Sequence, residues 1–203
     1  MNLMRLLALA LASATFLSGC ASQPTVSQAE VTIAPDTHIP LPSPGQLGYS
    51  LTASQLLSAK WPGQTAGQQL PVQLQVDQHG LILAGFSSWG TRILSLQYQN
   101  GIIDSDVMAG LSSQLPEPQQ ILFNLMITLW PQSAWEGPLN TVSWRLIDEA
   151  NRRLVFNETG ETVIEIRYAN PQRLTGEIEF FHHQLNYQIS IITLDHQIGP
   201  IQP

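Results

Sequence analysis

Cysteine and lysine are almost absent from this 203-residue chain, in which Cys20 is the only cysteine and Lys60 the only lysine. A single cysteine excludes a disulfide within the chain, so apolar packing alone has to hold the fold together. Charged residues make up 11% of the sequence, well below the roughly 25% of an ordinary soluble domain. The net charge is −7. This balance argues against nucleic acid and anionic headgroups as partners, because both are bound by clustered basic residues.

Long apolar runs are also scarce, and the one near the start of the chain is the most informative. Residues Leu6–Phe16 follow the basic Arg5 and are too few to span a bilayer. The sequence Leu-Ser-Gly-Cys, which ends at Cys20, comes next and matches the lipobox of bacterial lipoproteins. We therefore expect a signal peptide over residues 1–19 and an acylated Cys20 as membrane anchor. An ordinary secretory signal with an incidental cysteine is the alternative.

The residues after Cys20 indicate a destination and a linker. Ala21 and Ser22 follow the cysteine, whereas Asp in the next position retains enterobacterial lipoproteins in the inner membrane. We therefore expect the periplasmic face of the outer membrane. Residues 20–48 are rich in Pro, Ser, Thr and Gln without a sustained period, which is typical of a flexible tether. The folded domain is expected over residues 49–203.

Most of that domain has the period of two residues that is typical of half-buried strands. Val72, Leu74 and Val76 alternate with polar residues, and Asn100-Gly101 is a strong signal for a type I′ hairpin. The expected strands fall into two blocks, one before and one after residue 130. The first block covers residues 72–76, 81–86, 92–98 and 102–107, and the second covers residues 142–147, 153–157, 161–168, 174–182 and 185–194.

One helix separates the two blocks. Residues Pro118–Trp130 begin with proline and stop before Pro131. From Ile121 onward only Asn124 and Thr128 are polar, so the helix is apolar around most of its circumference. Such a helix is buried on more than one side. We expect it to plug or cover the concave face of a single curved antiparallel sheet.

No pattern in the chain favours catalysis, a cofactor or a metal. Residues 85–90 contain Gly and Ser, but neither the spacing nor the strand context is that of a nucleophile elbow. His182 and His183 are adjacent on a strand and point to opposite faces, so they cannot chelate together. Two pairs of glutamates, Glu161 with Glu165 and Glu177 with Glu179, fit an outward acidic face better than the catalytic pair of a glycosidase. No phosphate loop or dinucleotide fingerprint occurs. We do not expect an enzyme.

Trp89 is the one aromatic residue in an unusual position. It lies in Ser87-Ser88-Trp89-Gly90, a turn signal between two expected strands. A large apolar side chain at a hairpin tip has no obvious core to fill. Either the loop folds back and buries Trp89, or the side chain projects from the surface.

This order of lipobox, tether, strands, apolar helix and further strands resembles the outer-membrane lipoprotein receptors of the LolB family and their soluble relatives, the LolA carriers. That resemblance implies a mainly β fold with a central helix: a single antiparallel, strongly curved incomplete β-barrel with a helical lid. It implies a cavity for acyl chains and an exposed, membrane-contacting loop residue at Trp89, although the proline that precedes this residue in LolB is absent. The cavity and lid residues expected on this basis are Leu122, Leu125, Met126, Leu129, Trp130 and Trp144.

The chain also resembles an uncharacterised family of small bacterial lipoproteins with a domain of unknown function, over roughly residues 47–194. Leu129-Trp130-Pro131, Trp89-Gly90 and Ile166-Arg167-Tyr168 carry this resemblance. Its members often accompany genes for aryl-polyene or fatty-acid-type synthesis, together with LolA-like carriers, which implies such a carrier as a partner.

Three functions follow as hypotheses. The first is a lipoprotein that receives an acyl or lipid-like cargo and passes it to the outer membrane. The second is a non-transporting scaffold or assembly subunit of an envelope or polyene-biosynthesis system, and the third is an accessory enzyme of lipid or polyene transfer. A carrier requires a continuous apolar cavity. A scaffold requires an exposed apolar patch, and an enzyme requires polar groups that converge in a pocket.

Overall fold

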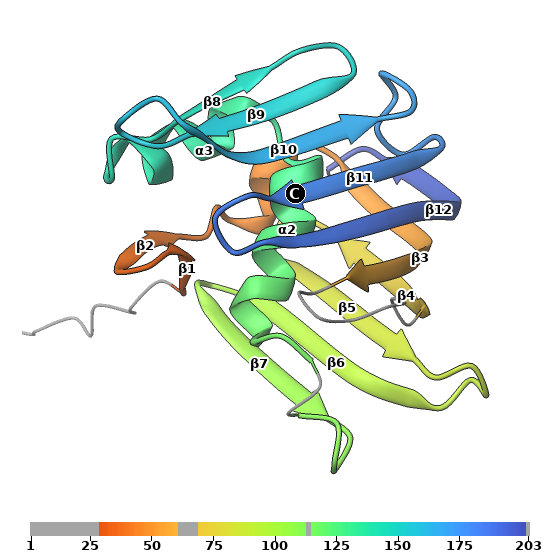
Figure 1. Ribbon diagram of the computed structural model, residues 1–203. Helices are drawn as coiled ribbons and strands as arrows, with labels where there is room; N and C mark the ends of the chain where they lie inside the picture. Colours follow the sequence, from red (N-terminus) through yellow and green to blue (C-terminus); the bar gives the residue numbers. More distant parts are fainter. Residues whose placement is uncertain (1–28, 61–68, 113–114, 202–203) are drawn as a thin grey trace, which may run out of the picture.

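The computed structural model describes residues 29–60, 69–112 and 115–201, and ten of its strands form one antiparallel sheet (Figure 1). Their order across the sheet is β7-β6-β5-β4-β3-β12-β11-β10-β9-β8. The first half contains β3 (Ser50–Lys60), β4 (Gln69–Val76), β5 (Gly80–Phe86), β6 (Arg92–Gln99) and β7 (Ile102–Val107). The second half contains β8 (Arg145–Asp148), β9 (Arg152–Phe156), β10 (Thr162–Tyr168), β11 (Glu177–His182) and β12 (Tyr187–Gly199).

Alternation in the sequence determines which face of each strand is buried. In β4, Val72, Leu74 and Val76 are buried while the glutamines between them are exposed, as expected. The β6–β7 hairpin turns at Asn100 and Gly101, whose φ angles are +53° and +79°. Both residues therefore adopt the left-handed backbone that a type I′ turn requires, and the hairpin prediction is confirmed.

Each half of the sheet is a meander of neighbouring strands, and the two halves join where β3 pairs with β12. At the outer edges β7 pairs only with β6 and β8 only with β9 within the described part of the chain, so the sheet curves without closing. The expected fold class, a mainly β, strongly curved incomplete barrel with a central helix, is confirmed.

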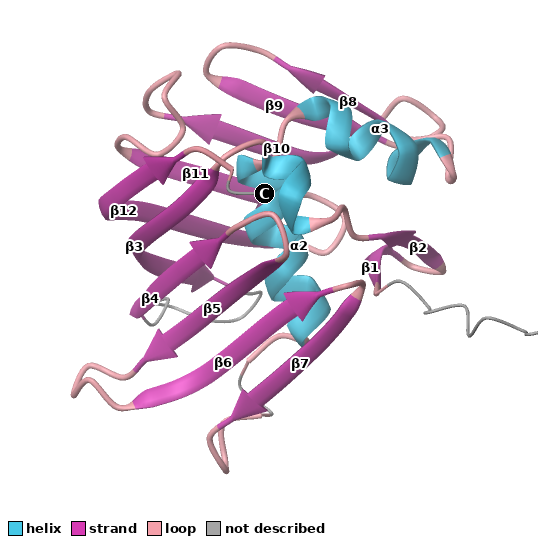
Figure 2. Cartoon of the chain, turned by 180° about the vertical axis from the view of Figure 1, so that it is seen from behind, coloured by secondary structure: helices cyan, strands magenta, loops and turns pink. Residues whose placement is uncertain are grey.

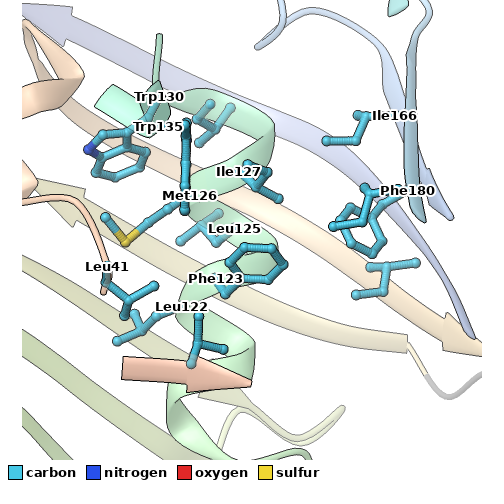
Figure 3. Packing of buried hydrophobic residues seen from close by; sticks show 14 of the residues in the cluster. Leu41, Leu122, Phe123, Leu125, Met126, Ile127, Trp130, Trp135, Ile166 and Phe180 are labelled. Carbon is cyan, nitrogen blue, oxygen red and sulfur yellow. The ribbon is translucent and has the colours of Figure 1, made fainter. Parts of the chain in front are cut away.

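Helix α2 (Pro118–Leu129) runs between the two halves of the sheet (Figure 1). Every residue from Leu122 to Leu129 is buried, because α2 has neighbours on opposite sides. Phe123 points toward Phe180 of β11, while Leu122 points toward Leu41 (Figure 3). The apolar circumference of α2 in the sequence thus reflects contact with two separate layers.

The C-terminal end of α2 is fixed by hydrogen bonds from the second half of the sheet. The buried Arg153 of β9 donates from Nη1 to the carbonyl oxygens of Ile127 (2.5 Å) and Trp130 (2.8 Å). Tyr168 of β10 donates its hydroxyl to the Thr128 carbonyl at 2.9 Å. These contacts satisfy carbonyls that a helix end leaves without partners, so α2 is held firmly at this end.

A second helix, α3 (Gln132–Asn140), follows directly and lies beside β8 (Figure 2). The sequence did not indicate it, since Gly137 and Pro138 interrupt its pattern. Its buried Trp135 makes an edge-on contact with Phe123 of α2, with ring centroids 5.5 Å apart. The expected strand over 142–147 begins only at Arg145, because residues 141–143 form a turn.

The tether expected over residues 20–48 differs from the structure from residue 29 onward. That part forms a two-stranded sheet, β1 (Glu30–Ala34) and β2 (Thr37–Pro40), and the short helix η1 (Pro44–Leu47). The physical reason is that the side of α2 that faces away from the sheet is also apolar, and apolar residues of this segment bury it. Those buried are Val31, Ile33, Ile39, Leu41 and Leu47. The signal peptide and Cys20 lie outside the described residues.

Among the described helices, none is long and apolar enough to cross a bilayer.

Candidate functional site

A cavity of about 1560 Å³ lies between the N-terminal half of α2 and the concave face of the sheet. Strands β1, β3 to β6, β11 and β12 contribute to its wall, together with the β5–β6 turn and with Met108, Leu111, Leu115 and Pro116. Most of the lining side chains are apolar, among them Leu57, Val72, Leu83, Leu125, Phe180 and Ile191.

The period of the strands explains this apolar wall. Leu57 and Ala59 of β3 point to the same face, and Ile191 and Ile189 lie opposite them on β12. These four side chains line the cavity at the point where the two halves of the sheet join. The volume exceeds the roughly 300–1,000 Å³ of a typical small-molecule site. The cavity is therefore suited to one or more long hydrocarbon chains.

The charges at the cavity are negative. Glu30 and Glu117 lie in its wall, and no Lys, Arg or His is among the lining residues that the structure describes. A carboxylate or phosphate placed in this cavity would therefore be desolvated without a cationic partner, which is costly. The wall favours an uncharged guest.

One polar cluster interrupts the apolar wall. Gln120 and Asn124 lie one turn apart on α2, facing Tyr187 of β12. The Tyr187 hydroxyl donates to Asn124 Oδ1 at 2.8 Å. Gln120 Nε2 donates to the same oxygen at 3.1 Å and to the Tyr187 hydroxyl at 3.0 Å. Burial raises the pKa of Tyr187 far more than these hydrogen bonds lower it. The hydroxyl therefore stays protonated, and the cluster is uncharged.

Two aromatic side chains pack against the Tyr187 ring. The Phe180 ring lies 5.7 Å from the Tyr187 ring, nearly parallel to it, and the His182 ring lies 5.1 Å away. His182 is buried, and this burial lowers its pKa to about 4 against an opposing hydrogen bond with the Ile33 backbone. His182 is therefore neutral at pH 7. His183 is exposed, so the two histidines do point to opposite faces.

The β5–β6 turn lies at the edge of the cavity and exposes Trp89. The Trp89 side chain is 90% exposed, which decides between the two conformations left open by the sequence in favour of projection. The turn is ordered by hydrogen bonds from Gly90 N to the Ser87 carbonyl (2.9 Å) and from Ser87 N to the Thr91 carbonyl (2.8 Å). Gly90 has a φ of +79°, a conformation that favours glycine. Met108, also partly exposed, lines the same edge.

Only one of the six expected cavity residues lines this cavity. Leu125 does so, whereas Leu122, Met126, Leu129 and Trp130 are buried in the packed core. Trp144 is also buried, and its Nε1 donates to Glu158 Oε2 at 2.8 Å.

The reason lies in the two-sided burial of α2. Residues Leu122–Leu129 are buried on every side of the helix, and the sequence alone does not indicate which side meets the cavity. Strand residues such as Tyr187 and Ile189 form much of the rest of the wall. A usable signal for the polar cluster was present, since Asn124 is one of only two polar residues in an otherwise apolar stretch of the helix.

Comparison with known proteins gives one family and several structures. Residues 52–195 match the family model described as "Protein of unknown function (DUF3261)". No curated protein matches the sequence.

Three solved structures match the chain at low similarity. An outer membrane lipoprotein-sorting protein domain from Vibrio parahaemolyticus is 9% identical, with a TM-score of 0.38, and the match covers 75% of this chain and 86% of that one. A LolA superfamily protein from Nitrosomonas europaea is 8% identical, with a TM-score of 0.40 and coverages of 80% and 94%. A DUF1329 family protein from Desulfovibrio piger is 6% identical, with a TM-score of 0.33 and coverages of 76% and 88%.

Proposed function

Since the chain belongs to DUF3261, a family whose description leaves its function open, a function has to follow from the site, and we propose that this protein is a lipid carrier. It binds a hydrophobic acyl or lipid-like cargo in the cavity and helps to transfer it to the outer membrane. A LolA-like periplasmic carrier is the proposed donor. The mechanism needs no catalytic residue, because release into a membrane is downhill wherever the membrane holds the chain better than the cavity does.

The observation that carries this proposal is the large apolar cavity, which opens beside an exposed tryptophan. Each apolar Å² that a guest buries is worth roughly 25 cal/mol, so an acyl chain of ordinary length would bind without a charged contact. Tryptophan favours the interface between membrane and water, where its ring is buried and its N–H stays hydrated. Trp89 would therefore bring the cavity edge to the bilayer surface.

Native mass spectrometry tests the proposal directly. The full chain, purified in nanodiscs and released gently, is expected to carry a bound acyl or polyene species that solvent extraction then identifies. A protein that is consistently released without any such adduct would contradict the carrier function.

The proposed anchor has its own test. Cys20 carries the acyl chains in this proposal, which would hold the protein on the periplasmic face of the outer membrane. Replacing Cys20 by alanine removes the acylated thiol, so we expect the protein to leave the outer-membrane fraction. Fractionation of cell envelopes followed by detection of the protein measures this. Unchanged recovery in the outer membrane would show that Cys20 is not the anchor.

Trp89 provides a test of membrane contact. Trp89→Glu places a charge at the tip that is proposed to enter the interface, and we expect at least about a tenfold slower transfer of cargo to vesicles. The melting temperature should stay unchanged, because the side chain is exposed. Ile102→Glu is the matched control, since Ile102 is 58% exposed in the neighbouring hairpin but does not line the cavity. Equal transfer by both variants would contradict a specific role for Trp89.

The scaffold function is the alternative, and exposed apolar side chains of one strand favour it. Ile192, Leu194 and Ile198 of β12 are exposed apolar residues on one strand. If Leu194→Glu abolished the activity of the protein in cells while bound cargo and transfer were unaffected, the scaffold hypothesis would replace the carrier.

A further inference from the structure

The polar cluster in the cavity is incompletely paired. Asn124 is 5% exposed and lines the cavity. Its Oδ1 accepts hydrogen bonds from Tyr187 and Gln120, which fixes the orientation of the amide and leaves the nitrogen on its other side. That nitrogen donates no hydrogen bond to any described residue. A fixed, buried amide whose N–H groups have no partner among the residues that the structure describes is available to an acceptor on a guest.

A second unpaired group lies on the same helix. Gln119 also lines the cavity, and its Oε1 is buried without a hydrogen-bond partner among the described residues. This oxygen has almost no accessible surface, so the uncharged group that α2 offers to a guest is the Asn124 amide. Buried polar groups in proteins are nearly always paired, so an unpaired Oε1 beside this amide is unusual.

Resting on the proposed carrier function, we infer that the cargo bears an uncharged oxygen acceptor, an acyl carbonyl or a hydroxyl, that hydrogen-bonds to the Asn124 amide inside the cavity. A plain hydrocarbon would cover this amide without replacing its contact with water, and would bind less tightly for that reason. A free carboxylate is also disfavoured, because the wall contains Glu30 and Glu117 and, among its described residues, no cation. Esters, amides and alcohols of long chains satisfy both conditions.

Competition between matched probes tests the inference. The full chain is placed in phosphatidylcholine nanodiscs that contain equal amounts of methyl laurate, N-methyl lauramide and tridecane, and adducts are counted by native mass spectrometry. The adduct of each probe is divided by the amount of that probe in the disc. By this measure the wild type should retain the ester and the amide about tenfold more than the hydrocarbon, because one hydrogen bond is satisfied. Adding laurate to the disc compares the charged form, which should be retained less than the ester.

Two variants and a control locate the effect. Asn124→Leu keeps a similar volume and removes the donor, so its preference for ester and amide should disappear while tridecane still binds. Tyr187→Phe removes the hydroxyl that orients Asn124, and should weaken the preference without a change in volume. Thr128→Val changes a polar side chain of α2 that does not line the cavity, and should leave the preference as in wild type.

The outcomes separate the inference from the proposed function. Equal retention of ester and hydrocarbon by the wild type, or an unchanged preference in both Asn124→Leu and Tyr187→Phe, would overturn the inference and leave the carrier function standing. Retention of no probe by the wild type would overturn both.

Discussion

Replacing Arg153 by methionine is expected to lower the free energy of unfolding by about 3–5 kcal/mol, as is usual when one member of a buried ion pair is removed. Arg153 is fully buried, pairs with Asp148 through Nη2 at 2.7 Å and donates to two carbonyls at the end of α2. Methionine fills much of the same space but leaves those carbonyls without donors. Urea denaturation at pH 7 measures the loss.

Arg152→Met is the matched control on the neighbouring residue. Arg152 is about half exposed in its pair with Glu149, so its replacement should cost at most about 1 kcal/mol. Equal costs for the two variants would contradict a special role for the buried contacts of Arg153.

The same cluster predicts a pH dependence. Burial alone would raise the pKa of Asp148, but the hydrogen bonds and charges of Arg153 and Arg173 outweigh it and hold the pKa below its ordinary value. The folded state therefore binds this proton less readily than the unfolded state. The resulting stability is present above the ordinary carboxyl pKa and is lost as pH falls through the lowered value. In Arg153→Met this acid-dependent loss should be smaller, because one of the two cations is gone.

Narrowing the cavity should weaken binding without unfolding the protein. Ala59 is small, half-buried and part of the cavity wall. In Ala59→Trp the indole would occupy space that the guest needs. Displacing two methylenes at about 0.8 kcal/mol each already weakens binding by more than about tenfold. Measuring the ligand adduct by native mass spectrometry gives the result.

Thr52→Trp adds the same ring to the same strand on its exposed side, and its adduct should match that of wild type. Loss of the adduct in both variants would indicate a general disturbance of β3. Full retention in Ala59→Trp would show that the guest binds elsewhere.

Much of the fold could be predicted from the sequence because local physics decides it. Alternation placed Val72 and Leu74 inside, Asn100-Gly101 marked a hairpin, and prolines at both ends of α2 limited the helix. Helix α3 could not be predicted, because Pro138 and Gly137 are poor helix formers, and contact with β8 and the burial of Trp135 compensate for them. The order of the strands across the sheet was equally hidden, since the pairing of β3 with β12 is purely tertiary.

The site was predicted less well than the fold. The position of Trp89 in a turn left its exposure open, only the family resemblance favoured projection, and Asn124 was noticed as polar. Tyr187 and Ile189 lie two residues apart on β12 and share its buried face. Their meeting with Asn124 depends on the rotation of α2 about its axis. That rotation depends on contacts of Arg153 and Tyr168 with the end of α2, and both residues are distant from Asn124 in the sequence.

The pairing of β3 with β12 has a consequence for the order in which the chain can fold. Ser50 pairs with Gly199 and Lys60 with Gln188, so contacts between the most distant parts of the described chain hold the sheet together. Each meander can form from neighbouring hairpins, but this pairing has to await the last strand and carries the highest loop-closure entropy. It is therefore the step expected to limit the folding rate. A chain truncated before Tyr187 would consist of two meanders that share no sheet, and the cavity would lose the part of its wall that Tyr187, Ile189 and Ile191 form.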